Sequence, residues 1–206
     1  RYQEVTGVQT CALPISNTGS LLEIEVTVIP AVDKGSINIT GIVEEESIGD
    51  KGKSIRRKSM AKGSIENVLT VLRSMGVPAD QYDIHVNFPG GIPVDGPSAG
   101  IAMATGIYSA IYRIPVKSDI ALTGEISIHG FVKPVGGVYP KVKAAKLAGA
   151  KSAIIPYENM GALLQEIEGI EVKPVKHLQE VFNIALDKEK PEEEIAFNDK
   201  VNKKSV

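Results

Sequence analysis

The chain has 206 residues, 43% of them hydrophobic, which is enough for one globular domain with a substantial core and too few for a multidomain machine. Its 23 basic and 25 acidic side chains give a formal net charge of −2, which argues against nucleic acid or an anionic membrane as a partner, because dedicated binders carry a basic surplus. The single cysteine, Cys11, excludes an internal disulfide and favours a reducing, cytoplasmic location.

The beginning of the chain has no recognisable periodicity. Residues 1–17 also lack the charged start and the continuous apolar segment of a signal peptide. We therefore expect a disordered or extraneous leader over 1–17, followed by a single domain over 18–187. From Leu22 to Val28 apolar residues alternate with polar ones, and the pattern resumes from Ile37 to Val43 after Asp33-Lys34-Gly35, which predicts two strands joined by a turn.

Two helices and a strand are predicted in the middle of the chain. Ile65, Val68, Leu69 and Leu72 have the spacing of an amphipathic helix, and the next strand runs from Ile84 to Phe88 before an irregular Pro- and Gly-rich loop. A helix with a face of small residues follows over Ser98–Ile111. The longest apolar stretch, Ala99–Tyr112, is about 14 residues, well short of the ~20 that span a bilayer, so we do not expect the chain to cross a membrane.

The last third alternates short strands and helices, and this alternation favours an α+β (mixed α/β) fold with small mixed sheets packed against helices. A charged tail over 188–206 is expected to be disordered. The predicted elements are strands at Ile120–Thr123 and Ile126–Val135 with a turn at Gly130, a helix opened by Pro140 and stopped at Gly149, a strand at Ala153–Ile155, a helix at Leu163–Ile167, a strand at Val172 and a helix at Leu178–Ala185.

A serine at the start of a predicted helix is the first candidate for chemistry. Ser98 follows Asp95 and Gly96, and the unpaired backbone N–H groups around Ser98 and Ala99, together with the helix dipole, suit the stabilisation of an oxyanion. Acyl transfer needs such a site. A plain capping serine explains Ser98 equally well when this residue is considered alone.

The spacing Gly96-x-Ser98-x-Gly100 matches the nucleophile turn of the α/β-hydrolases, in which a strand leads directly into the serine. The preceding loop contains two prolines and two glycines, so no strand is expected to lead into Gly96. A Ser-His enzyme also needs a histidine after the serine. His129 and His177 are the available ones, and both are expected to be ordinary surface residues.

A lysine provides the alternative base. Lys141 follows the helix-starting Pro140 and lies in the first helical turn, where the helix dipole disfavours a cation. As a general base, a lysine needs a pKa lowered from about 10.4 to roughly 7–8, and both a helix N-terminus and an apolar pocket act in that direction. From position alone, an exposed Lys141 is the more ordinary interpretation.

Several short motifs follow one another along the chain. They are Pro93-Val94-Asp95-Gly96-Pro97-Ser98-Ala99-Gly100, Leu122-Thr123-Gly124-Glu125-Ile126, Gly130, and Pro134-Val135-Gly136-Gly137-Val138 with Lys141 and Ala144-Ala145. Together they resemble the proteolytic domain of the Lon proteases (peptidase family S16), from about Leu21 to about Leu186. The stretch PGGIPVDGPSAG resembles most closely the LonB-type branch of spore-forming bacteria.

This resemblance implies a serine endopeptidase with Ser98 as nucleophile and Lys141 as general base and acid. Thr123 would orient the lysine, with Asp95, Gly96 and Ala99 in supporting roles. It also implies unfolded or damaged proteins as substrates, no cofactor or metal in this chain, and a full-length bacterial protein with an AAA+ ATPase module that uses ATP and Mg and forms a homo-hexamer. The chain has no G-x-x-x-x-G-K-[ST] motif. A catalytically inactive Lon-like assembly domain is the alternative that the resemblance leaves open.

Overall fold

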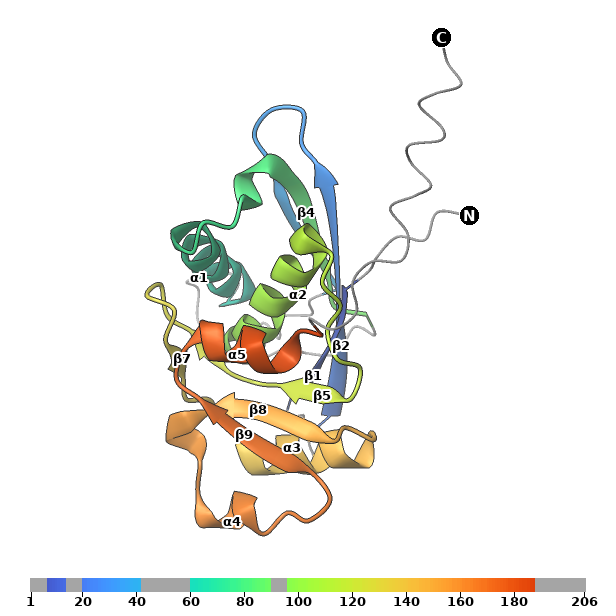
Figure 1. Ribbon diagram of the computed structural model, residues 1–206, viewed down its shortest axis with the longest axis vertical. Coiled ribbons are helices and arrows are strands. Elements are labelled where there is room, and N and C mark those ends of the chain that lie inside the picture. Colours follow the sequence, from blue (N-terminus) through green and yellow to red (C-terminus); the bar gives the residue numbers. More distant parts are fainter. Residues whose placement is uncertain (1–6, 14–19, 42–59, 90–95, 188–206) are drawn as a thin grey trace, which may run out of the picture.

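A seven-stranded mixed sheet and five helices make up the computed structural model, which describes residues 7–13, 20–41, 60–89 and 96–187 (Figure 1). The order of strands in the sheet is β3-β4-β2-β1-β5-β8-β9, and a separate two-stranded sheet pairs β6 with β7. The strands are β1 (Gly7–Leu13), β2 (Ser20–Pro30), β3 (Ile37–Thr40), β4 (Tyr82–Asn87), β5 (Ile120–Leu122), β6 (Glu125–Ile126), β7 (Val132–Lys133), β8 (Ser152–Pro156) and β9 (Glu171–Val175). The fold is α+β, as the sequence predicts.

The helices match the predicted amphipathic segments closely. They are α1 (Met60–Ser74), α2 (Gly100–Tyr112), α3 (Val138–Leu147), α4 (Ala162–Gln165) and α5 (Leu178–Ala185), with 3₁₀ turns η2 (Ala79–Gln81), η3 (Gly96–Ala99) and η4 (Tyr157–Asn159). Some boundaries differ. Helix α2 begins at Gly100, with Ser98 in the turn before it, and α4 ends at Gln165 rather than Ile167. Helix α3 begins at Val138, so Pro140 is its third residue rather than its first. A proline is tolerated there, since the first-turn amides have no partner within the helix.

Two features of the sheet depart from the sequence predictions. The strands β2 and β3 exist as predicted, but β4 lies between them, antiparallel to β2 and parallel to β3. The segment Gly7–Leu13, expected to be part of a disordered leader, forms strand β1, which pairs with β2 along its whole length and with β5 at Cys11. Pairing on two sides, rather than an alternating pattern, defines this strand. Residues 1–6 and 14–19 lie outside the described part, as does the predicted tail over 188–206, and the foreign origin of 1–17 stays a prediction.

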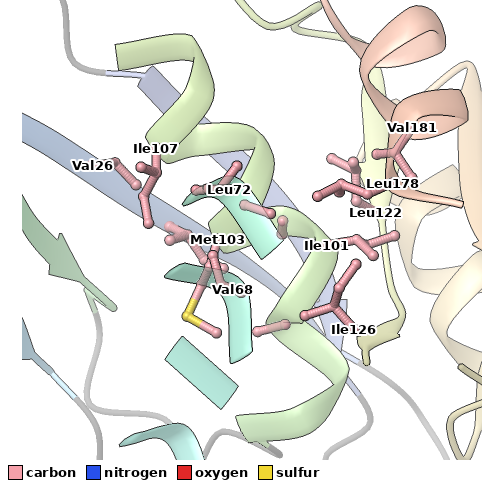
Figure 2. Close-up of a cluster of buried hydrophobic side chains, with 14 of the residues drawn as sticks. Val26, Val68, Leu72, Ile101, Met103, Ile107, Leu122, Ile126, Leu178 and Val181 are labelled. Atoms are coloured by element: carbon pink, nitrogen blue, oxygen red, sulfur yellow. The ribbon is translucent and has the colours of Figure 1, made fainter. Parts of the chain in front are cut away.

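One face of the sheet is covered by α1, α2 and α5, which gather together in Figure 1. Their buried side chains form, with those of β2 and β4, a cluster that we call the large core. Figure 2 shows α2 at its centre, with Ile101 and Ile107 directed toward different neighbours. The labelled members of the large core are Val26, Val68, Leu72, Ile101, Met103, Ile107, Leu122, Ile126, Leu178 and Val181.

The opposite face of the sheet carries α3, which lies behind β8 and β9 in Figure 1. The buried residues on this face of the sheet form a second cluster, which we call the small core. Its members are Ala121, Val138, Val142, Ala145, Ala153, Ile155, Leu164, Ile167 and Ile170. Successive residues of a strand point to opposite faces. In β5, accordingly, Leu122 belongs to the large core and Ala121 to the small core, so this strand separates the two. Among the described residues, no helix has both the length and the apolar character needed to cross a bilayer.

Candidate active site

Ser98 lies in η3, immediately before α2, and its side chain is fully buried. Its backbone carbonyl accepts a hydrogen bond from the Gly124 N–H at 2.9 Å and a longer one, 3.5 Å, from the Thr123 hydroxyl. In return, the Ile101 N–H donates to the Gly124 carbonyl at 3.1 Å. The start of α2 is therefore fastened to the segment that follows β5.

The residues that flank Ser98 take different places. Ala99 is fully buried and is the N-terminal cap residue of α2, while Gly96 begins η3. Asp95 lies outside the described residues. No side chain caps α2 through a hydrogen bond. Ser98 itself precedes the cap position, so the plain capping serine considered above is not what the structure has.

Two glycines allow the start of α2 to approach the segment that follows β5. A Cβ atom on Gly100 would lie 3.0 Å from the Ile126 backbone nitrogen, and one on Gly124 would lie 2.9 Å from the Val132 Cγ1 atom. Contacts that short are essentially forbidden for a side chain at Gly124 and very tight at Gly100. The glycine of each motif is thus required by the packing of η3 and α2 against β6 and β7.

Lys141 lies in the first part of α3 and is fully buried. It is among the largest of the fully buried side chains in the described part of the chain. The helix begins after Gly137, whose φ of 65° is in the left-handed region, and the Lys141 N–H donates to the Gly137 carbonyl at 3.2 Å. An exposed lysine, the ordinary interpretation of its position, is therefore wrong. Burying an ammonium group is costly, so a buried lysine at this point needs an explanation beyond packing.

Thr123 connects the two candidates. It follows β5 directly, its hydroxyl reaches the Ser98 carbonyl, and it lines the same small pocket as Lys141. The other lining residues of that pocket are apolar: Ala121, Leu122, Val142, Ala145, Ala153, Ile154 and Ile155. Apart from Lys141, no described residue that lines this pocket is titratable. Thr123 therefore lies between the segment of Ser98 and the pocket of Lys141.

The histidines needed by the alternative Ser-His mechanism lie elsewhere. His129 is exposed near the turn at Gly130. His177 is also exposed; it caps α5 and its ring packs against Phe131, with ring centroids 4.6 Å apart. The strand before Ser98, β4, ends at Asn87, so it does not lead directly into Gly96. Among the described residues, no strand leads into the Gly96-x-Ser98-x-Gly100 match and no buried histidine accompanies it.

Sequence reasoning missed one polar residue that contacts the segment leading into α3. Asn159, in η4, accepts a hydrogen bond from the Val135 N–H at 2.9 Å and donates one to the Val135 carbonyl at 3.0 Å. These bonds join positions 24 residues apart, and neither residue has a local pattern that announces the contact.

Fold and site together define a class of α+β domain in which a buried serine before one helix and a buried lysine in another approach the end of the same strand. The family of Lon protease (S16) C-terminal proteolytic domains matches residues 1–188. The chain belongs to this family.

Named relatives agree with this assignment. The chain is 65% identical to Lon protease 2 of Bacillus subtilis over 190 residues, 92% of the chain and 34% of that protein. It is 39% identical to the Lon protease of Escherichia coli strain K12 over 83% of the chain and 21% of that protein, and 40% identical to Lon protease 1 of Hydrogenovibrio crunogenus over 82% of the chain and 20% of that protein. The chain thus spans about a fifth to a third of these relatives. The higher identity to the Bacillus protein agrees with the predicted LonB-type branch.

Proposed function

We propose that this chain is the proteolytic part of an ATP-dependent serine endopeptidase, in which Ser98 is the nucleophile and Lys141 the general base and acid. The observation that carries this proposal is the complete burial of Lys141 in an apolar pocket that it shares with Thr123, the residue whose hydroxyl reaches Ser98. Burial of this kind supports a role that uses the neutral amine. A lysine that must be neutral near physiological pH requires it.

The reaction needs only these two side chains, the substrate and water. The neutral Nζ of Lys141 takes the hydroxyl proton of Ser98 as Oγ bonds to the carbonyl carbon of the substrate. When the tetrahedral intermediate collapses, the C–N bond breaks and the lysine returns the proton to the leaving amine, which leaves an acyl ester on Ser98. Lys141 then takes a proton from water, hydroxide attacks the ester, and the proton returns to Oγ as the acid product leaves.

The supporting residues have separate parts in this scheme. The backbone N–H groups around Ser98 and Ala99 are the proposed donors to the oxyanion, and Gly96 allows the chain to turn into η3. Thr123 is proposed to keep Ser98 and Lys141 in place relative to each other. Its hydroxyl makes a long contact, 3.5 Å, with the Ser98 carbonyl, and it lines the pocket of Lys141. Asp95 is proposed to shape the loop before the serine, and its position is outside the described residues.

The larger protein is part of the proposal. Because the chain covers 34% of Lon protease 2 of Bacillus subtilis, we propose that it works within a longer protein with an AAA+ ATPase module, which uses ATP and Mg. That protein would form a homo-hexamer in the bacterial cytoplasm and supply unfolded or damaged proteins to the site. The proteolytic steps above use no metal or cofactor of this chain, and they involve neither nucleic acid nor a membrane.

The direct test is peptide cleavage by the chain and four variants of it. Ser98→Ala and Lys141→Met should each reduce kcat/KM by at least about 1,000-fold. Their unfolding temperatures should remain close to that of the unchanged chain, because methionine fills the space of the buried lysine stem. His129→Ala and His177→Ala are the matched controls and should cleave normally.

Retained cleavage by Lys141→Met would contradict the proposed dyad. Loss of cleavage in either histidine variant, with the fold intact, would favour a Ser-His hydrolase instead. A folded chain that cleaves no peptide and whose Ser98 resists a serine-reactive probe would identify it as an inactive assembly domain.

A further inference from the structure

The side chain of Asn159 satisfies both backbone polar groups of Val135. Its Oδ1 accepts from the Val135 N–H at 2.9 Å and its Nδ2 donates to the Val135 carbonyl at 3.0 Å, as a neighbouring strand would. Val135 is half-buried and packs against the small core, and so does Met160, the residue after Asn159. This asparagine therefore holds one residue of a connecting segment from both sides.

The held segment leads into the helix of the lysine. Val135 lies between β7 and α3, and Gly136 and Gly137 separate it from the first helical residue. Two consecutive glycines give a connection many accessible conformations, so its direction depends on contacts made by its neighbours. Gly137 is in the left-handed region and its carbonyl accepts the hydrogen bond of the Lys141 N–H. The place of Val135 thus influences where α3 begins.

Asn159 lies in η4, directly after β8, the strand that also accepts a hydrogen bond from Thr123. It lies three residues after Pro156, the end of β8, and β8 pairs in parallel with β5. The Thr123 N–H continues this pairing by donating to the Ile154 carbonyl at 3.0 Å. The segment β8–η4 therefore contacts both sides of the site: Thr123 through the backbone of Ile154, and the connection before Lys141 through Asn159.

We propose that Asn159 is a positioning residue, which sets α3 and the amine of Lys141 relative to Thr123 and Ser98. The role of Lys141 in this inference rests on the proposed function above. Without the two hydrogen bonds to Val135, the glycine connection relaxes and water reaches the pocket of the lysine. Solvated amine is protonated more readily, so the chain holds less of the neutral base at a given pH and the remaining base is placed less accurately.

The first readout does not depend on activity. An amine-acylating reagent is added to the chain, and the modification rates of Lys141 and of Lys143 in the same helix are followed by mass spectrometry. Lys143 is exposed and is the internal control, whereas Lys141 is buried and should react slowly. Asn159→Ala should raise the rate at Lys141 about tenfold relative to Lys143, because local opening governs access to buried groups.

The second readout is the pH profile of peptide cleavage. Asn159→Ala should lower kcat about 10- to 100-fold with KM changed less than about twofold, as expected when a reacting group is misplaced. The rise of kcat/KM with pH should move to higher pH. Asn159→Asp keeps the acceptor for the Val135 N–H and loses the donor to its carbonyl, so its effect on kcat and on the reactivity of Lys141 should be intermediate. This milder variant carries the same test if the alanine variant does not fold.

A destabilised variant elsewhere separates positioning from general loosening. Val181→Ala, in the large core, should lower the unfolding temperature without changing the Lys141 modification rate or the pH profile. The inference is overturned if Asn159→Ala matches the unchanged chain in both readouts, or if Val181→Ala reproduces its effects. Cleavage that survives in Lys141→Met would overturn the proposed function instead, and increased exposure of Lys141 in Asn159→Ala would still support the positioning role.

Discussion

The large core and the small core differ in size, in composition and in which candidate residue they hold. Ser98 is followed by Ala99 and Ile101 of the large core, whereas Lys141 is next to Val142 of the small core. The two cores lie on opposite faces of the sheet and share β5, at whose end Thr123 reaches Ser98 and borders Lys141. The nucleophile and the base thus come from separate packing units that meet at one strand.

This difference separates stability from chemistry. The large core holds bulky side chains such as Phe88, Leu72 and Phe182, which dominate the free energy of folding. The small core is formed by few, mostly small or β-branched residues around a buried lysine. We therefore expect substitutions in the large core to act on global unfolding, and substitutions in the small core to act first on the local placement of Lys141.

The largest stability effect is expected in the large core. Leu72→Ala removes a fully buried side chain of α1 from the large core and should reduce the free energy of unfolding by about 2–5 kcal/mol. Leu163→Ala is the matched control, because that leucine is 64% exposed, and it should cost far less. Urea denaturation measures both. Equal losses for the two leucines would contradict the assignment of the core.

A pair of valines compares the two cores directly. Val68 and Val142 are both fully buried, the first in the large core and the second in the pocket of Lys141. Each Val→Ala change should lower the free energy of unfolding by about 2 kcal/mol. Val142→Ala alone should also accelerate acylation of Lys141 and slow peptide cleavage. If Val68→Ala changed the reactivity of Lys141 as much, the two cores would not be separate units.

The glycines at the two ends of α3 give a smaller effect. Gly137 and Gly149 both have positive φ, 65° and 91°, so alanine at either position should cost about 1–2 kcal/mol of stability through backbone strain. Gly137→Ala should in addition reduce cleavage, because this residue precedes the first turn that carries Lys141. Gly149→Ala should leave the rate unchanged, and steady-state kinetics on both variants distinguishes the two ends.

The smallest effect on stability is expected from an ion pair on the protein surface. Arg73, near the end of α1, forms an ion pair of 2.6 Å with Asp80, and this hydrogen-bonded contact lowers the pKa of the Asp80 carboxyl. A lowered pKa stabilises the fold above the usual carboxyl pKa of about 3.9, and the contribution is lost as the pH falls through the folded-state value. Asp80→Asn should therefore lower the unfolding temperature slightly at neutral pH.

At acid pH, or in about 1 M salt, the unfolding temperatures of the Asp80→Asn variant and the unchanged chain should converge, because solvent and ions screen an exposed pair. A difference that grew on acidification would contradict the sign of the pKa shift.

Local patterns predicted most of the elements, because each amphipathic segment has to bury one face. The helix through Ile65 and Leu72 and the later strands and helices are confirmed. The insertion of β4 between β2 and β3 was not predictable in this way, since strand partners far apart in sequence leave no local trace. Strand β1 was missed for the same reason: its hydrogen bonds with β2 and β5 define it, and its sequence does not alternate.

The candidate site was predictable to a different extent for each residue. Ser98 and Lys141 are candidates because each lies at the start of a predicted helix. Position alone favours an exposed Lys141, and only the family resemblance indicates a catalytic lysine. Thr123 came from the resemblance alone, and its hydrogen bond to Ser98 now gives it a physical connection. Asn159 was not identified, because an asparagine in a short turn is ordinary until the fold brings Val135 beside it.

The most direct test of the account is the covalent labelling of Ser98 by a serine-reactive fluorophosphonate, followed by peptide mapping as a function of pH. The account predicts a single label on Ser98, a labelling rate that rises with pH, and a rate at least about 100-fold lower in a folded Lys141→Met variant. Labelling of Ser98 at the same rate with and without Lys141, or a label on another residue, would contradict it.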